Sequence, residues 1–122
     1  MKKILVADDD GKLQLLLRTV LSDAGYDILH ASDGEETMRL VKSERPHLIL
    51  LDIAMPKMNG YEVCKEIRSD PDPAVAKIKI VVISVKSYSV DIKSAKEFGV
   101  DEYLVKPFSI KELKETVMRI LG

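Results

Sequence analysis

The sequence predicts an α/β fold in which five parallel strands form one sheet and helices cover both of its faces. Three observations predict it: short continuous apolar runs, longer segments of helical periodicity between them, and glycines where the chain must reverse. Apolar runs that do not alternate are typical of strands buried on both faces, which is how parallel sheets are built. The predicted strands are Ile4–Ala7, Ile28–Ala31, Leu48–Leu51, Ile78–Ser84 and Tyr103–Val105.

Five apolar stripes with spacings of three or four residues predict the helices. The first stripe includes Leu16, the fourth is closed by Gly99, and the last has Ser109 as its predicted N-cap. Pro71 and Pro73 predict a loop before the fourth strand. The stripes run through Leu13–Ala24, Thr37–Val41, Val63–Ile67, Ile92–Phe98 and Ile110–Leu121.

Strands and helices therefore alternate five times, as (βα)5. Right-handed crossovers leave few arrangements for such a chain, and the flavodoxin-like, doubly wound three-layer sandwich with strand order 2-1-3-4-5 suits its length. In that arrangement the winding direction reverses between strands 1 and 3. A ligand site is expected where the carboxyl ends of these two strands meet.

The composition fits one domain over residues 1–122. Hydrophobic residues make up 46% of the chain and charged residues 32%, which excludes a disordered or collagen-like chain. The net charge of −1 gives no bulk attraction to nucleic acid or anionic membranes, and no apolar run is long enough to span a bilayer. Cys64 is the single cysteine, which favours a reduced, cytoplasmic setting.

Carboxylates follow the first and third predicted strands directly. Asp8, Asp9 and Asp10 come after the first strand, and Asp52 comes after the third. Because these strand ends are neighbours in the predicted sheet, Asp8, Asp9 and Asp52 should converge. Clustered carboxylates repel one another unless a cation neutralises them, and hard oxygen ligands suit Mg²⁺. Asp10 is interpreted as a loop or helix-cap residue outside this set.

Two further polar residues stand at strand ends. Ser84 ends the fourth predicted strand, and Lys106 follows the fifth, directly before Pro107. A phosphoryl-transfer site needs a nucleophile, a cation for the developing charge and a hydroxyl or N–H donor. Each residue alone is weak evidence, but their coincidence with the aspartates at four strand ends predicts such a site.

The same residues carry a resemblance to a known family. Four segments carry it: KKILVADDD, HLILLDIAMPKMNGYEV, IKIVVIS and GVDEYLVKPF. From Lys2 to Gly122 the chain resembles the response-regulator receiver domains of two-component phosphorelay systems, the CheY-like family. The second segment is the most specific, because an aspartate after an apolar strand is followed within ten residues by Met-Pro and Asn-Gly.

The resemblance implies roles at the acidic end of the sheet. Asp52 resembles the phosphoacceptor of the family. Asp9 resembles the direct metal ligand of the acidic pair, and Asp8 its partner acting mostly through water. The backbone carbonyl of Ala54 matches the third protein ligand of the metal. Lys106 matches the lysine that meets the phosphoryl oxygens.

The resemblance also implies a switch. Ser84 matches the hydroxyl that moves toward the phosphoryl group, and Tyr103 matches the aromatic switch position. A cis peptide bond between Lys106 and Pro107 is implied as well. The chain departs from the family after the switch hydroxyl, where Val85 and Lys86 replace the usual small residue and its neighbour. This departure predicts slow formation and slow decay of the phosphorylated state.

The implied function is a phosphorylation-dependent signalling switch. A sensor histidine kinase or a histidine phosphotransfer protein supplies the phosphoryl group, with Mg²⁺, or Mn²⁺ as an alternative. The face made by the fourth helix, fifth strand and fifth helix then acts on a downstream effector or a fused output domain. The resemblance implies no turnover of an external substrate, no direct contact with nucleic acid or membrane, and either a monomer or a phosphorylation-dependent dimer.

Three other functions fit parts of the same pattern. An FMN-binding electron carrier of the same fold class needs N–H donors after strand 1, where three carboxylates stand here. A haloacid-dehalogenase-like phosphatase resembles the Asp-x-Asp of Asp8 and Asp10, but Lys12 stands where Thr or Val is expected. A receiver-like module that binds partners with little or no phosphorylation is the remaining alternative.

Overall fold

A computed structural model describes residues 1–53, 55, 57, 60–85 and 97–122. Five parallel strands form one sheet in the order β2-β1-β3-β4-β5, which confirms the predicted fold and strand order. The strands are β1 (Lys3–Ala7), β2 (Asp27–Ala31), β3 (Leu48–Asp52), β4 (Lys79–Val85) and β5 (Glu102–Lys106). The described helices are α1 (Gly11–Asp23), α2 (Gly34–Glu44), α3 (Gly60–Arg68), α4 (Pro73–Ala76) and α6 (Ile110–Leu121).

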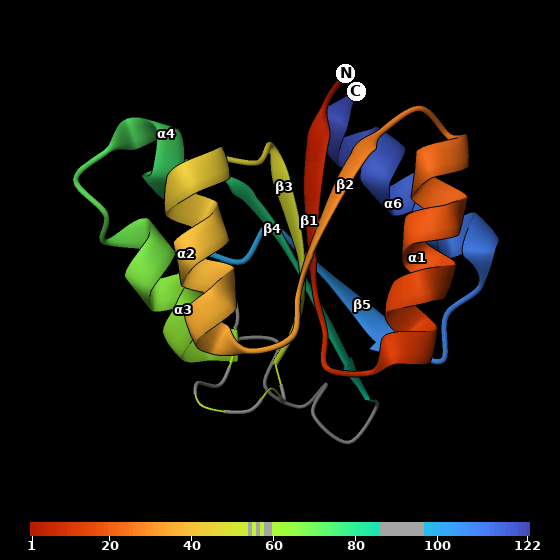
Figure 1. The fold of residues 1–122 in the computed structure, drawn as a ribbon, viewed down its shortest axis with the longest axis horizontal. Coiled ribbons are helices and arrows are strands. Elements are labelled where there is room, and N and C mark those ends of the chain that lie inside the picture. The colour runs from red at the N-terminus through yellow and green to blue at the C-terminus, as the bar shows by residue number, and fades with distance from the viewer. Residues whose placement is uncertain (54, 56, 58–59, 86–96) are drawn as a thin grey trace.

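The sheet is the middle layer of three. Helices α1 and α6 cover one face, α2 and α3 cover the other, and the two termini lie side by side at the amino-terminal edge of the sheet (Figure 1). No helix in the described part of the chain is both long and apolar enough to cross a membrane.

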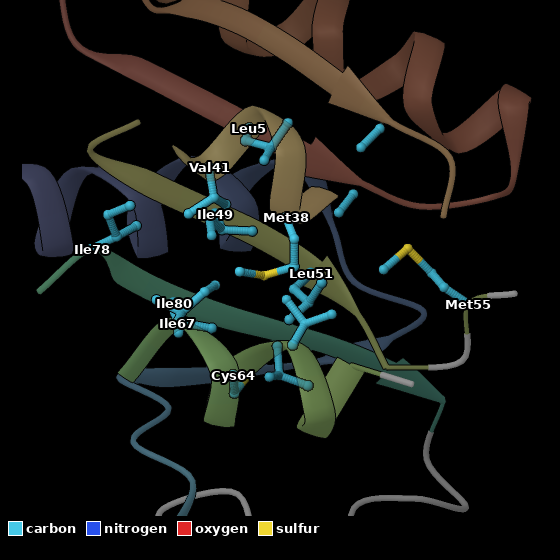
Figure 2. Close-up of a cluster of buried hydrophobic side chains, with 14 of the residues drawn as sticks. Leu5, Met38, Val41, Ile49, Leu51, Met55, Cys64, Ile67, Ile78 and Ile80 are labelled. Atoms are coloured by element: carbon cyan, nitrogen blue, oxygen red, sulfur yellow. The ribbon is translucent and has the colours of Figure 1, made fainter. Parts of the chain in front are cut away.

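The sheet separates two buried clusters because side chains alternate along each strand. In β3, Ile49 and Leu51 pack toward α2 and α3, whereas Leu48 and Leu50 pack toward α1 and α6. All five residues of β3 are buried, which accounts for its continuous apolar run. Figure 2 shows the first cluster, where side chains of α2 and α3 meet those of the strands.

Cys64 lies within that first cluster. It is a free, fully buried cysteine on α3, and burial raises the pKa of its thiol to about 12. A neutral, buried thiol behaves as a small hydrophobic side chain.

Helix α1 corrects the predicted stripe. Leu16 is 45% exposed, whereas Gln14 is buried together with Leu17 and Leu21. Positions 14, 17 and 21 share one helix face, because their spacings of three and four residues repeat the helical turn. Residue type alone favoured Leu16, but the phase of the helix places Gln14 toward the sheet.

The expected loop at Pro71 and Pro73 is also corrected in part. Pro73 begins the one-turn helix α4, and the Asp72 side chain accepts a hydrogen bond from the Ala74 N–H. An Asp N-cap followed by Pro at the first helical position is a strong helix start, so the local sequence supports this turn. Ser109 caps α6 as predicted, accepting a hydrogen bond from the Glu112 N–H at 3.0 Å.

The predicted helix over Ile92–Phe98 falls mainly on residues 86–96, which lie outside the described residues. Gly99, predicted to close it, adopts a positive φ of 80°, a conformation that favours glycine.

Candidate functional site

The register of the sheet brings the predicted site residues to one edge. Ala7 pairs with Leu51, and Asp52 pairs with Ile83, so β1, β3 and β4 end at nearly the same level. Each of Asp8, Asp9 and Asp52 offers a carboxylate oxygen, and these oxygens all lie within 4.8 Å of one another. The predicted convergence of these three carboxylates is therefore confirmed.

Asp8 is the most buried of the three, at 1% exposure. Its Oδ1 accepts a hydrogen bond of 2.8 Å from the Asp10 N–H. Asp10 turns the other way, since its own carboxylate caps α1 by accepting from Lys12 N–H and Leu13 N–H. The interpretation of Asp10 as a cap residue is confirmed, and the turn it forms holds the Asp8 carboxylate at the sheet edge.

Lys106 supplies the cation at this edge. Its Nζ lies 3.4 Å from Asp8 Oδ2 and 3.7 Å from Asp52 Oδ2, so it bridges the ends of β1 and β3 from the end of β5. The Lys106–Pro107 peptide bond is cis. One ammonium facing three carboxylates leaves an excess of negative charge.

Gln14 is the site-supporting residue that sequence reasoning missed. Its side-chain amide donates hydrogen bonds to the backbone carbonyls of Asp8 and Ala31, the latter at 2.8 Å. It thereby ties α1 to the ends of β1 and β2, beneath the acidic turn. The available signal was a polar residue in phase with Leu17 and Leu21.

The remaining predicted residues are placed as follows. Ser84 is buried near the end of β4, opposite Val105 of β5. Tyr103 is half-buried, pairs with Val82 and packs against the α2 and α3 side of the sheet. Ala54 and Lys86 lie outside the described residues, as does the side chain of Val85.

Burial and crowding act together on the Asp8 carboxyl. Desolvation raises its pKa above the ordinary value, and the nearby Asp52 carboxylate raises it further. The Asp10 N–H and Lys106 lower the pKa but do not offset the burial. The ionised Asp8 is thus less favourable in the folded chain than in the unfolded one.

Replacing this carboxylate by its neutral isostere should stabilise the metal-free protein. In chelator at neutral pH, Asp8→Asn should unfold at a higher urea concentration than wild type, because the amide removes the buried charge and keeps an oxygen for the Asp10 N–H. In wild type, the ionised Asp8 carboxylate destabilises the fold fully at a pH above its raised pKa. This destabilisation is lost as the pH falls through that pKa and the carboxyl becomes protonated. A lower midpoint for Asp8→Asn in chelator would show that the Lys106 contact outweighs burial.

The donor set fits a small, hard dication. Mg²⁺ binds oxygen ligands at about 2.1 Å, so its oxygens are separated by distances on the order of 3–4 Å. The three carboxylates of Asp8, Asp9 and Asp52 offer oxygens at comparable separations and carry the negative charge that such an ion neutralises. They are the residues of the described chain that would hold it.

Comparison with known proteins agrees with this geometry. The profile of the response regulator receiver domain matches residues 4–118. The alkaline phosphatase synthesis transcriptional regulatory protein PhoP of Bacillus subtilis is 40% identical over 120 residues, covering 98% of this chain and 48% of that protein. The chain spans about half the length of the curated relatives it matches.

Two solved structures superpose over nearly the whole chain. The chemotaxis response regulator CheY4 of Vibrio cholerae gives a TM-score of 0.90 at 29% identity, covering 98% of each chain. The receiver domain of the sensor histidine kinase PA1611 of Pseudomonas aeruginosa, solved with magnesium in its active-site cleft, gives 0.88 at 26% identity, covering 99% of this chain and 98% of that one. With its parallel sheet and its acidic strand ends, this chain belongs to the response regulator receiver domain family.

Proposed function

We propose that this chain is a phosphorylation-dependent switch whose Asp52 accepts a phosphoryl group from a phosphohistidine. One observation carries the proposal: a nucleophilic carboxylate, two further carboxylates and a lysine meet at a single sheet edge, within a chain of the receiver family. Receiver domains serve phosphorylation-based signalling and generally do not turn over an external substrate.

The residues divide the chemistry between them. An oxygen of Asp52 attacks phosphorus, the new O–P bond forms as the N–P bond of the phosphohistidine breaks, and the imidazole keeps the electron pair. Lys106 stabilises the charge on the transferred oxygens, since its Nζ already lies 3.7 Å from the Asp52 carboxylate. Hydrolysis of the acyl phosphate returns Asp52 to its free form.

Asp8, Asp9 and Asp52 would hold Mg²⁺, or Mn²⁺ as an alternative, together with the backbone carbonyl of Ala54. The ion supplies neutralisation of the phosphoryl charge when bound. Support comes from the clustered oxygens and from the magnesium in the homologous PA1611 receiver domain.

Ser84 and Tyr103 would move in response to the new charge. An acyl phosphate adds nearly two negative charges at Asp52, and Ser84 directly follows Ile83, the β4 residue that pairs with Asp52. Movement of Ser84 toward the phosphoryl group frees space that Tyr103 can fill. The face made by the expected helix Ile92–Phe98, by β5 and by α6 would then favour a second conformation.

Response regulators work with histidine kinases and output domains, and PhoP is named a transcriptional regulatory protein. We place a sensor histidine kinase or a histidine phosphotransfer protein upstream, and a downstream effector or fused output domain downstream, in the cytoplasm. Contact with DNA would belong to the output domain, and this chain itself would be a monomer or a phosphorylation-dependent dimer.

The proposal is tested with a small-molecule donor. Purified protein incubated with acetyl phosphate and Mg²⁺ should gain the mass of one phosphoryl group, and the adduct should be released by hydroxylamine, as acyl phosphates are. Chelation of the metal should prevent the gain. A folded protein that gains no mass from acetyl phosphate or from phosphorylated histidine kinases would instead support a receiver-like module that only binds partners.

Metal binding should depend on Asp9 and not on Asp10. Asp9→Ala removes one of the clustered oxygens and should weaken Mg²⁺ binding about tenfold or more. Asp10→Ala removes the α1 cap, so it should cost about 1 kcal/mol of stability and leave Mg²⁺ affinity close to wild type. Titration followed by calorimetry or NMR measures both, and equal losses of affinity would contradict the assignment.

A further inference from the structure

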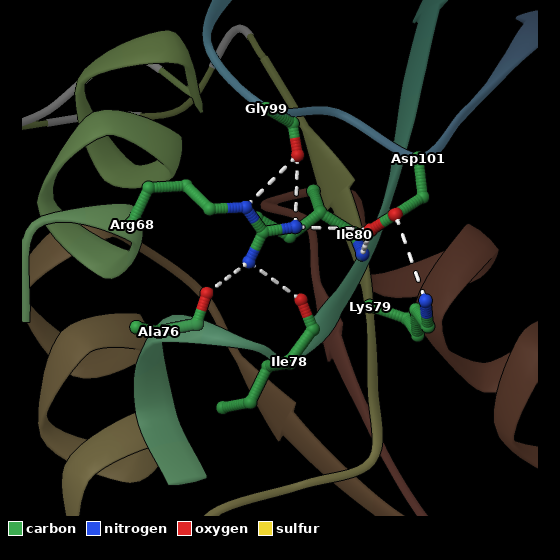
Figure 3. Close-up of polar contacts among 7 residues, drawn as sticks. All are labelled: Arg68, Ala76, Ile78, Lys79, Ile80, Gly99 and Asp101. Carbon is green, nitrogen blue, oxygen red and sulfur yellow. Dashed lines mark hydrogen bonds and ion pairs between the residues drawn. The ribbon is translucent and has the colours of Figure 1, made fainter. Parts of the chain in front are cut away.

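A single guanidinium joins three separate segments of the chain. Arg68, the last residue of α3, donates to the Gly99 carbonyl through Nε at 3.0 Å and through one terminal nitrogen at 2.8 Å. Its other terminal nitrogen donates to the carbonyls of Ala76 and Ile78 at 2.8 and 2.7 Å. Figure 3 shows the side chain reaching from α3 to the segment that enters β4 and the segment that enters β5.

Asp101 completes this contact set. Its Oδ2 accepts from Arg68 at 2.9 Å and from the Ile80 N–H at 2.8 Å, while its own N–H donates to the Ile80 carbonyl at 2.9 Å. Both backbone groups of Ile80 are thus paired with one residue. These two bonds precede the first β4–β5 pair, Val81 with Glu102, and so set the register of the ladder.

β5 depends on this start more than the central strands of the sheet do. It is an edge strand, paired with β4 alone in the described sheet, and Leu104 is its one buried residue. Register is strongly specified where a buried face demands it and weakly specified otherwise. β3, with all five residues buried, needs no comparable polar anchor. A one-residue slip of β5 would turn Lys106 to the opposite face of the sheet.

We propose that Arg68 and Asp101 form a clamp that fixes the register of β5 and thereby positions Lys106 at the phosphoryl site. The clamp lies at the amino-terminal end of the strand and Lys106 at its carboxyl end, where Val85 pairs with Lys106. The inference rests on the proposed function of Lys106. Arg68 and Asp101 are positioning residues, since neither touches the reacting groups.

Gly99 also contributes to the clamp. A Cβ at this position would come within 2.8 Å of Arg68 Nε and 2.9 Å of Arg68 Cγ, so the guanidinium stem lies directly against the glycine backbone. The positive φ of Gly99 lets its carbonyl face the guanidinium from there. The clamp therefore requires the planar fork of an arginine, and a lysine can satisfy only part of it.

A double-mutant cycle tests the coupling. The rate of phosphorylation by acetyl phosphate at saturating Mg²⁺ is measured for wild type, Arg68→Lys, Lys106→Ala and the double variant, at a temperature where all are folded by circular dichroism. Arg68→Lys should react about tenfold slower, because a displacement on the order of 1 Å is enough to disturb a reacting geometry. The double variant should be no slower than Lys106→Ala alone. If the double variant instead showed the product of the two separate reductions in rate, the two residues would act independently and the proposal would be overturned.

Magnesium affinity distinguishes positioning from general damage. The acidic residues come from β1 and β3, which the clamp does not touch, and Lys106 repels a dication. Arg68→Lys should therefore bind Mg²⁺ as tightly as wild type or more tightly while it reacts more slowly. Slower reaction together with weaker Mg²⁺ binding would mean that the whole site is distorted, which contradicts the clamp.

Two further variants keep the test decisive. Ile67→Val removes a buried methyl group from the same helix and leaves the clamp intact, so its rate should equal that of wild type. Asp101→Asn keeps an oxygen for the Ile80 N–H and replaces Arg68→Lys in the cycle if that variant does not fold. Failure of wild type to be phosphorylated would reject the proposed function, whereas a phosphorylated wild type with an uncoupled Arg68 would reject only the clamp.

Discussion

Asp52→Asn should abolish phosphorylation, reducing uptake from acetyl phosphate by at least about a hundredfold, because the amide keeps the shape of the side chain but is not a nucleophile. The neighbouring Asp8 carboxylate is a poor substitute. Asp8 is 1% exposed, and its two oxygens already meet the Asp10 N–H and the Lys106 ammonium. Asp52 also lies at the strand end, within reach of Lys106.

The measurement is the mass of the intact protein after incubation with donor and Mg²⁺, with circular dichroism to show that the variant is folded. The substitution removes one of three mutually repelling carboxylates, so the variant should be at least as stable as wild type in chelator. Asp27→Asn is a suitable control, because it changes an exposed aspartate at the amino-terminal end of β2, away from the acidic site, and should leave uptake unchanged. Labelling of Asp52→Asn at the wild-type level would place the acceptor elsewhere.

Much of the fold and of the site could be predicted because both depend on patterns that the sequence displays. Strands buried on both faces appear as continuous apolar runs, and all five runs became strands. In a parallel sheet the residue after each run must lie at the same edge as its neighbours. Asp8, Asp52 and Lys106 could therefore be brought together without any knowledge of side-chain conformation.

What the sequence did not reveal depends on phase and on distant contacts. Leu16 and Gln14 differ only by the rotation of α1 about its axis, and residue type favoured the wrong one. The bonds from Arg68 to Gly99 and Asp101 span 31 and 33 residues and mostly end on backbone carbonyls, which have no residue type to read. In the sequence, an arginine at the end of an amphipathic helix cannot be distinguished from one whose side chain is simply solvated.

Close packing explains the glycine in the Asn-Gly pair that follows β3. Gly60 is buried at the start of α3, and its N–H donates to the Ile53 carbonyl at 2.8 Å. A Cβ built on Gly60 would lie 2.5 Å from the Ile53 Cα and 3.1 Å from the Asp52 carbonyl oxygen. Since the nearest atom is backbone, no side-chain rotation can relieve the contact, and either α3 or the end of β3 must move.

Gly60→Ala should therefore destabilise the protein by about 2 kcal/mol or more and slow phosphorylation in the fraction that stays folded. The displaced segment begins at Asp52 itself, so loss of stability and loss of reactivity have one cause. Gly11→Ala is the matched control: it also begins a helix, no atom lies within 4 Å of its Cβ position, and it should stabilise the protein by about 0.5 kcal/mol. Urea unfolding and phosphorylation rates decide the matter. If both variants change stability alike, close packing of α3 against the end of β3 is not what requires glycine at position 60.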